Sequence, residues 1–130
     1  MANILTVESS LSISWLYREI LQQEGHRVFS VMRGKEAVDF ALKESIDVVI
    51  VDERVPAFEA HGLLNELRRL HPAVRAILCT WGDLGLPVDK RLWDEIFFKN
   101  DNFTVLQGKV EGLCKEYPDT FSKTHYSVPL

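Results

Sequence analysis

Two acidic residues each follow an apolar run that is typical of a buried strand. Asp52 comes directly after Val48–Val51, and Glu8 comes directly after Ile4–Val7. Runs that are nearly all apolar indicate strands covered on both faces of a parallel sheet. If the two strands are neighbours, the carboxylates converge at one edge of the sheet, where their repulsion favours a bound divalent cation. Two carboxylates, a backbone carbonyl and waters would suit octahedral Mg²⁺.

A hydroxyl and an ammonium group end two further strands. Thr80 ends the run Ala76–Thr80, and Lys99 follows the short aromatic run Ile96–Phe98. Beside two carboxylates and a cation, the ammonium group can offset the charge of a phosphoryl group, to which the hydroxyl can donate a hydrogen bond. Each residue alone is weak evidence. The four residues at the ends of four strands together indicate a phosphoryl site.

Each carboxylate also has a purely structural interpretation. An Asp that follows a strand often caps the next turn or helix, so position alone does not decide the role of Asp52. The side chain of Glu8 could equally point to solvent or pair with a nearby lysine or arginine.

The strands that carry these residues alternate with helical patterns. One more strand is predicted at Val28–Val31. Apolar residues recur at helical spacing over Leu11–Glu24, Lys35–Glu44, Gly62–Leu70 and Asn102–Tyr117. This alternation predicts a doubly wound α/β fold with a five-stranded parallel sheet and helices on both faces. Sites in such folds lie at the carboxyl ends of the strands. The stretch Gly82–Glu95 predicts at most a short or irregular helix, because it holds two glycines and a proline.

Length and composition exclude several classes of function. The 130 residues are 46% hydrophobic and 26% charged, which is typical of one ordinary globular domain. The net charge of −4 argues against nucleic-acid binding, and no apolar run approaches the roughly 20 residues of a membrane span. Cys79 and Cys114 are predicted to be reduced core residues of a cytoplasmic protein. The histidines and the run Glu66–Arg69 are predicted to lie on the surface.

In these motifs the sequence resembles the receiver domain of two-component response regulators. The resemblance rests on ILTVES, VVIVDERVP, AILCTW and FFK, which carry the four strand-end residues. The spacing from Asp52 to Pro56 and the later Gly62-Leu63-Leu64 are also similar to the family pattern. The resemblance implies the flavodoxin-like strand order 2-1-3-4-5. It implies a receiver-like domain over residues 1–117, with residues 118–130 as a tail or linker too short for an output domain.

The resemblance also implies a role for each residue. Asp52 would accept a phosphoryl group from a phosphohistidine on a sensor histidine kinase or a histidine phosphotransfer protein. Glu8, Asp52 and the backbone carbonyl of Arg54 would hold Mg²⁺. Lys99 would pair with the phosphoryl oxygens, and Thr80 would move to bond one of them. The implied activity is at most self-phosphorylation with slow autodephosphorylation, and output would pass through protein contacts, including those of a homodimer.

Several residues depart from the family pattern. Ser9 stands where the family has a second acid, so we expect weaker Mg²⁺ binding. Trp81 replaces a small residue and would either cover the phosphorylation site or pack over the fourth strand. Ile96 occupies the position of the family's switch aromatic, and Asn100 replaces the proline that follows Lys99.

These departures leave two other interpretations open. One is a pseudo-receiver, a protein–protein interaction module that acts without phosphorylation. The other is an enzyme on a similar fold. The loop ESSLSIS after the first strand has no glycine, so it is a poor cradle for a flavin phosphate. Phosphatases of the haloacid dehalogenase type use a second acid two residues after the nucleophile, and Arg54 at that position argues against them.

Overall fold

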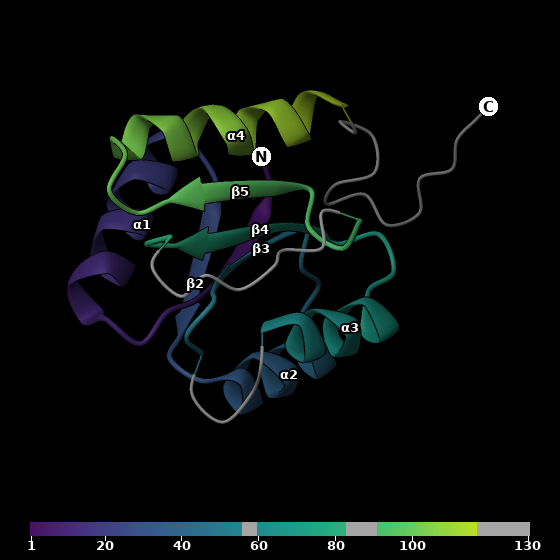
Figure 1. The fold of residues 1–130 in the computed structure, drawn as a ribbon. Coiled ribbons are helices and arrows are strands. Elements are labelled where there is room, and N and C mark those ends of the chain that lie inside the picture. Colours follow the sequence, from purple (N-terminus) through teal and green to yellow (C-terminus); the bar gives the residue numbers. More distant parts are fainter. Residues whose placement is uncertain (56–59, 83–90, 117–130) are drawn as a thin grey trace.

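A single sheet of five parallel strands in the order β2-β1-β3-β4-β5 organises the molecule. The computed structural model describes residues 1–55, 60–82 and 91–116 (Figure 1). The strands are β1 (Asn3–Val7), β2 (Arg27–Val31), β3 (Val48–Asp52), β4 (Arg75–Thr80) and β5 (Glu95–Phe98). The predicted fold and strand order are confirmed.

Helices cover both faces of this sheet. In the described residues they are α1 (Leu11–Gln23), α2 (Gly34–Lys43), α3 (Ala60–Leu70) and α4 (Phe103–Glu116). In Figure 1, α1 and α4 lie on one side of the sheet and α2 and α3 on the other. None of these helices has the length and apolar character that a membrane span requires. The predicted tail at residues 118–130 lies outside the described residues.

Local signals in the sequence fix the helix ends. The Ser10 hydroxyl caps α1 by accepting a hydrogen bond from the Ile13 amide at 3.3 Å. After α1 the chain turns at Gly25, whose φ of 88° lies in the left-handed region that favours glycine. Asn102 precedes α4 and accepts from the Thr104 amide at 2.9 Å. Ser10 and Gly25 thus set the two ends of α1, and Asn102 sets the start of α4.

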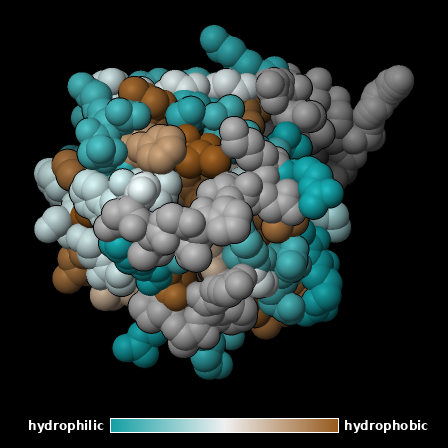
Figure 2. Space-filling model, viewed as in Figure 1, coloured by the Kyte–Doolittle hydropathy of each residue, from teal (hydrophilic) through white to brown (hydrophobic). Residues whose placement is uncertain are grey.

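Alternation along the strands divides the core into two clusters. Under α1 and α4, helix residues such as Tyr17, Leu21 and Leu106 pack against Ile4 and Ile50 of the sheet. The opposite cluster packs Ala37 of α2 and the leucines of α3 against the other face of the same strands. Successive strand residues therefore enter different clusters, because a strand points them to opposite faces. On the outer surface in Figure 2, brown hydrophobic residues are scattered among teal hydrophilic ones.

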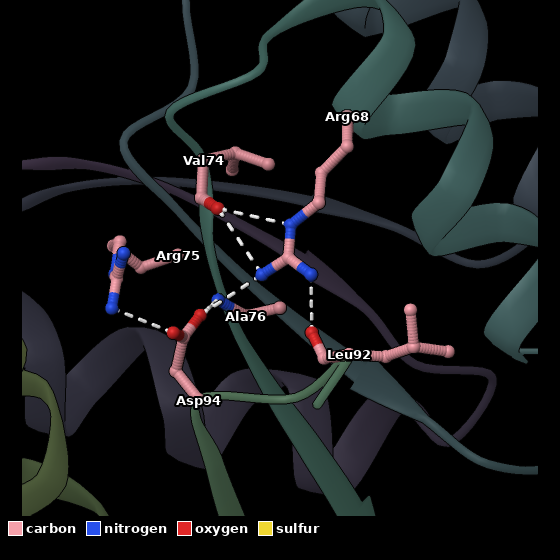
Figure 3. Close-up of polar contacts among 6 residues, drawn as sticks. All are labelled: Arg68, Val74, Arg75, Ala76, Leu92 and Asp94. Carbon is pink, nitrogen blue, oxygen red and sulfur yellow. Dashed lines mark hydrogen bonds and ion pairs between the residues drawn. The ribbon is translucent and has the colours of Figure 1, made fainter. Parts of the chain in front are cut away.

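At the amino ends of the last two strands, a cluster of charges joins α3 to the sheet (Figure 3). Arg68 of α3 pairs with Asp94 at 3.0 Å, and Arg75 pairs with the same carboxylate at 2.6 Å. Residues 91–94 form a turn that leads into β5, and residues 83–90 of the predicted irregular stretch lie outside the described residues. The prediction that Glu66–Arg69 is a solvated face is therefore wrong at Arg68, because its guanidinium reaches across to this turn.

The prediction that the histidines lie on the surface is wrong for His26. This residue is 7% exposed. Its Nδ1 accepts a hydrogen bond from the Ala2 amide at 3.0 Å, and its Nε2 lies 2.9 Å from a carboxylate oxygen of Glu111. His61 is half-buried, and its Nδ1 accepts from the Trp93 indole at 2.8 Å. The His26 ring is buried and the His61 ring half-buried, because distant parts of the chain supply partners for both ring nitrogens of His26 and for one of His61.

Candidate functional site

Lys99 lies between two buried carboxylates at the carboxyl end of the sheet. Its Nζ is 2.7 Å from Oε1 of Glu8 and 3.0 Å from Oδ1 of Asp52. Glu8 follows β1, Asp52 ends β3, and these two strands are neighbours in the sheet. Lys99 follows β5, two positions away from β3, so its long side chain reaches across the end of β4. The structure thus brings together three of the four residues that the sequence singled out.

Burial sharpens the electrostatics of this group, which we call the carboxyl-end cluster (Glu8, Asp52 and Lys99). The three residues are 2%, 5% and 5% exposed. Burial alone would lower the pKa of Lys99, but hydrogen bonding and charge attraction to Glu8 and Asp52 together outweigh it and raise that pKa above its usual value. The lysine is therefore charged at neutral pH, and this single cation faces two carboxyl groups.

The cluster offers the donors that Mg²⁺ prefers. Its excess of buried negative charge and its carboxylate oxygens match a hard cation that keeps several waters. The described residues contain no group of three or more His, Cys, Asp or Glu side chains placed to hold a metal. Magnesium at this edge would therefore need the two carboxylates plus a backbone oxygen, for which Arg54 lies in the turn after Asp52. Ser9 is exposed, while the amide of Ser10 holds the other oxygen of Glu8 at 3.0 Å.

The fourth predicted residue, Thr80, bonds a residue that sequence reasoning missed. Its hydroxyl donates a hydrogen bond to a carboxylate oxygen of Glu53. The register between β3 and β4 pairs Asp52 with Cys79, and the same offset places Glu53 opposite Thr80. The sequence shows an acidic residue directly after Asp52, but only the register between β3 and β4 reveals that this residue reaches Thr80.

Trp81 leans over the cluster from the end of β4. Its side chain is 43% exposed, and the ring centroid lies 5.8 Å from Nζ of Lys99. This separation is within the range of a cation–π interaction. The tryptophan thus lies over the lysine with nearly half of its surface in contact with solvent.

The fifth strand and the floor of the site are apolar. Ile96 is half-buried, whereas Phe97 is fully buried and meets the Phe103 ring edge-on at 5.3 Å. Cys79, paired with Asp52 in the sheet, is a free cysteine with no exposed surface. Burial raises the pKa of the Cys79 thiol to about 12, so the thiol stays protonated and unreactive at neutral pH. The side chains of Phe97 and Cys79 are therefore buried and uncharged.

Known proteins share this sequence pattern. The family model described as "Response regulator receiver domain" matches residues 4–86. Sporulation initiation phosphotransferase F of Bacillus subtilis is 29% identical over 84 residues, which are 64% of this chain and 68% of that protein. A response regulator receiver protein of Anaeromyxobacter is 31% identical over 80 residues, 62% of this chain but only 34% of that protein. The chain therefore spans about a third of the length of that second relative.

Solved structures share the fold. The response regulator TrrA of Thermotoga maritima, crystallised in complex with Mg²⁺ and beryllofluoride, is 29% identical with a TM-score of 0.75, and the match covers 87% of this chain and 99% of that one. TrrA in complex with the histidine kinase ThkA matches with a TM-score of 0.76. A receiver domain from Clostridium thermocellum has a TM-score of 0.78 at 22% identity, over 91% of this chain and 98% of that one, and shows the fold alone. Because the family model covers more than half of the chain, the chain belongs to the response regulator receiver domain family of two-component systems.

Proposed function

We propose that this chain is a phosphoacceptor, in which Asp52 takes a phosphoryl group from a phosphohistidine on a sensor histidine kinase or a histidine phosphotransfer protein. The observation that carries the proposal is the carboxyl-end cluster. One buried lysine bridges Asp52 and Glu8 at 3.0 and 2.7 Å, at the strand ends where sites of this architecture lie. A cluster used only for stability gains little from two buried carboxylates that share a single cation.

The chemistry follows from the positions of these side chains. A carboxylate oxygen of Asp52 attacks phosphorus, the bond from phosphorus to the imidazole nitrogen breaks, and its electron pair stays on that nitrogen. Lys99 is placed to offset the negative charge of the transferred phosphoryl oxygens. Glu8, Asp52 and the backbone carbonyl of Arg54 would hold Mg²⁺, which supplies further charge neutralisation when bound. The second acid of the family is absent at Ser9, so we propose weak Mg²⁺ binding.

A protein partner for this reaction is supported by apolar surface beside the site. Leu11, Trp15 and Met32 are 71%, 59% and 42% exposed and line a surface pocket of about 840 Å³. Exposed apolar groups that gather in one place are typical of protein–protein contacts. The complex of TrrA with the histidine kinase ThkA supports the same class of partner. We propose a cytoplasmic location, where free cysteines such as Cys79 stay reduced.

Labelling by a small phosphodonor tests the proposal. Incubation with acetyl phosphate and saturating Mg²⁺ should add one phosphoryl group, measured by intact-protein mass spectrometry. Asp52→Asn should abolish the addition, because the amide is not a nucleophile for phosphorus. Asp39→Asn is the matched control, since Asp39 lies exposed on α2. Absence of labelling in folded wild-type protein at saturating Mg²⁺ would contradict the proposal.

A pseudo-receiver is the second candidate function, and the exposed Ser9 favours it. In that case the chain would bind its partner without phosphorylation. Asp52→Asn would then leave partner binding unchanged, and Mg²⁺ titration would detect no saturable binding. Tight Mg²⁺ binding that Glu8→Gln weakens would argue against the pseudo-receiver.

A further inference from the structure

The Thr80 hydroxyl has a single proton, which it donates in a hydrogen bond to the Glu53 carboxylate. The oxygen of the same hydroxyl accepts a hydrogen bond from the Gly82 amide at 2.8 Å. A hydroxyl donates one hydrogen bond and accepts others, so Thr80 can donate to one acceptor at a time. While it donates to Glu53, it has no proton for any other oxygen at the site.

The backbone holds this arrangement from both sides. The Glu53 amide donates to the carbonyl of Cys79 at 3.0 Å, which keeps the turn after β3 against the end of β4. The chain after Thr80 turns at Gly82, where φ is 79° and glycine is favoured. The Lys99 amide donates to the Thr80 carbonyl at 2.8 Å. The backbone of Thr80 is therefore fixed at the site, and the partner of its hydroxyl can change by a side-chain movement alone.

From this geometry we propose that Glu53 is a positioning residue that competes with a phosphoryl group on Asp52 for the hydroxyl proton of Thr80. The proposal rests on the proposed function, since it needs a phosphoryl group at Asp52. Glu53 directly follows Asp52 in the chain, and Thr80 directly follows Cys79, the residue that pairs with Asp52 in the sheet. A phosphoryl oxygen at Asp52 and the Glu53 carboxylate are thus alternative acceptors for one donor.

Charge sets the direction of the competition. A phosphoryl group adds negative charge beside the carboxylate of Glu53, and like charges at short range repel. Phosphorylation therefore favours departure of the Glu53 side chain, which is half-buried and has solvent to move into. When the Thr80 hydroxyl turns its hydrogen bond from Glu53 to the phosphoryl group, occupation of Asp52 is coupled to a movement of the turn residue beside it. Until Glu53 leaves, it weakens the site for any phosphoryl group.

Beryllofluoride, a phosphoryl mimic, gives a direct test at saturating Mg²⁺. Its binding to the whole chain is followed by the ¹⁹F NMR signals of the bound form, so that no kinase is needed. Glu53→Ala should tighten binding on the order of 10-fold, because it removes a charged competitor for one hydrogen bond. Glu53→Gln should tighten binding less, since a neutral amide oxygen still accepts from Thr80. Glu19→Gln is the control, because Glu19 lies exposed on α1.

A double-mutant cycle with Thr80→Val separates positioning from charge repulsion. If Glu53 acts through the Thr80 hydrogen bond, the gain from Glu53→Ala is clearly smaller in the Thr80→Val background, where only charge repulsion remains. An equal gain in both backgrounds would show repulsion without Thr80 and overturn the proposal. The Gly82 amide peak in ¹H–¹⁵N spectra adds a readout that needs no ligand, because Gly82 bonds the same hydroxyl. That peak should shift in Glu53→Gln and stay unchanged in Glu19→Gln.

The behaviour of the wild-type protein distinguishes a failure of the competition from a failure of the phosphoacceptor function. Beryllofluoride binding by wild type with no gain in Glu53→Ala would overturn the role of Glu53 and leave the phosphoacceptor function standing. Absence of binding by wild type and all variants would overturn the phosphoacceptor function and the competition together.

Discussion

Two charged clusters lie at opposite ends of the same sheet, and their compositions are inverted. The carboxyl-end cluster has two carboxylates that share Lys99. The amino-end cluster (Arg68, Arg75 and Asp94) has two guanidinium groups that share one carboxylate. Among these residues, the first group has more carboxylates than cations and the second has more guanidinium groups than carboxylates. The two clusters also differ in their backbone hydrogen bonds and in their exposure to solvent.

Backbone groups satisfy two members of the amino-end cluster, Arg68 and Asp94. Arg68 donates to the carbonyls of Leu92 and Val74, and Asp94 accepts from the Ala76 amide at 2.7 Å. The side chains of the three charged residues are 16% to 25% exposed, so solvent water partly screens their charges. The carboxyl-end side chains are at most 5% exposed. Buried charged side chains with few backbone partners are available to bind a ligand, which indicates a binding site. Charged side chains that already bond to backbone groups indicate a structural role.

Removal of the shared ion should therefore cost most at the carboxyl end. In Lys99→Met, two buried carboxylates lose their cation, and the free energy of unfolding should fall by about 3–5 kcal/mol. Chemical denaturation at pH 7 in the absence of Mg²⁺ measures this loss. Added Mg²⁺ should raise the Tm of Lys99→Met more than that of wild type, because the variant site carries one more negative charge.

Magnesium gives a control for the same variant, because a bound cation replaces the charge of the missing lysine. If saturating Mg²⁺ restores none of the lost stability, the loss comes from packing of the lysine stem and not from carboxylate repulsion.

At the amino end, Asp94→Asn should lower the free energy of unfolding by about 1–3 kcal/mol. The loss is smaller than for Lys99→Met because Arg68 and Arg75 are about a quarter exposed, and Arg68 keeps its carbonyl partners. Beryllofluoride affinity and acetyl phosphate labelling should match wild type. A change in either activity that exceeds the change in stability would contradict the division between a structural and a functional cluster.

Glu8→Gln should affect stability least among the buried charges, with a change below about 1 kcal/mol, because Lys99 and Asp52 then form a neutral pair. The effect should appear instead in metal binding. Loss of one of two carboxylate ligands should weaken Mg²⁺ on the order of 10-fold, measured by isothermal titration calorimetry. Unchanged Mg²⁺ affinity would remove Glu8 from the ligand set.

Much of the carboxyl end was predictable because strand ends can be recognised in the sequence. Apolar runs located Glu8, Asp52, Thr80 and Lys99 at strand ends, and a parallel sheet places such ends at one edge. The bond between Thr80 and Glu53 was not predictable, since it depends on the register between β3 and β4. Register follows from side-chain packing across strands, which one sequence does not specify.

The amino end was harder to predict for a related reason. Arg68 lies in a charged run that is typical of a solvated helix face, and its partner Asp94 is 26 residues away. The buried His26 likewise depends on Ala2 and Glu111, which are 24 and 85 residues away. Local periodicity identifies helices and strands, but a polar side chain becomes buried only when a distant partner satisfies it.

Trp81 provides the smallest and most specific test of the carboxyl-end cluster, because its ring centroid lies 5.8 Å from Nζ of Lys99. Trp81→Leu should lower the free energy of unfolding by about 0.5–1 kcal/mol, the value of a partly exposed cation–π contact. In the Lys99→Met background the same substitution should have almost no effect. An undiminished loss there would show that the indole packs over β4 and does not act through the lysine.

The pH range of the Trp81 effect follows from Lys99. Its pKa is raised above the ordinary 10.5, so the folded protein binds this proton more tightly than the unfolded chain does. The stability that the lysine charge contributes is therefore fully present below pH 10.5 and is lost as the pH rises through the folded pKa. The difference between wild type and Trp81→Leu should be constant from pH 7 to 10 and shrink above that, because a neutral amine has no cation–π attraction. A difference that already fades by pH 9 would mean that the lysine loses its proton below its ordinary pKa, which two carboxylate partners should prevent.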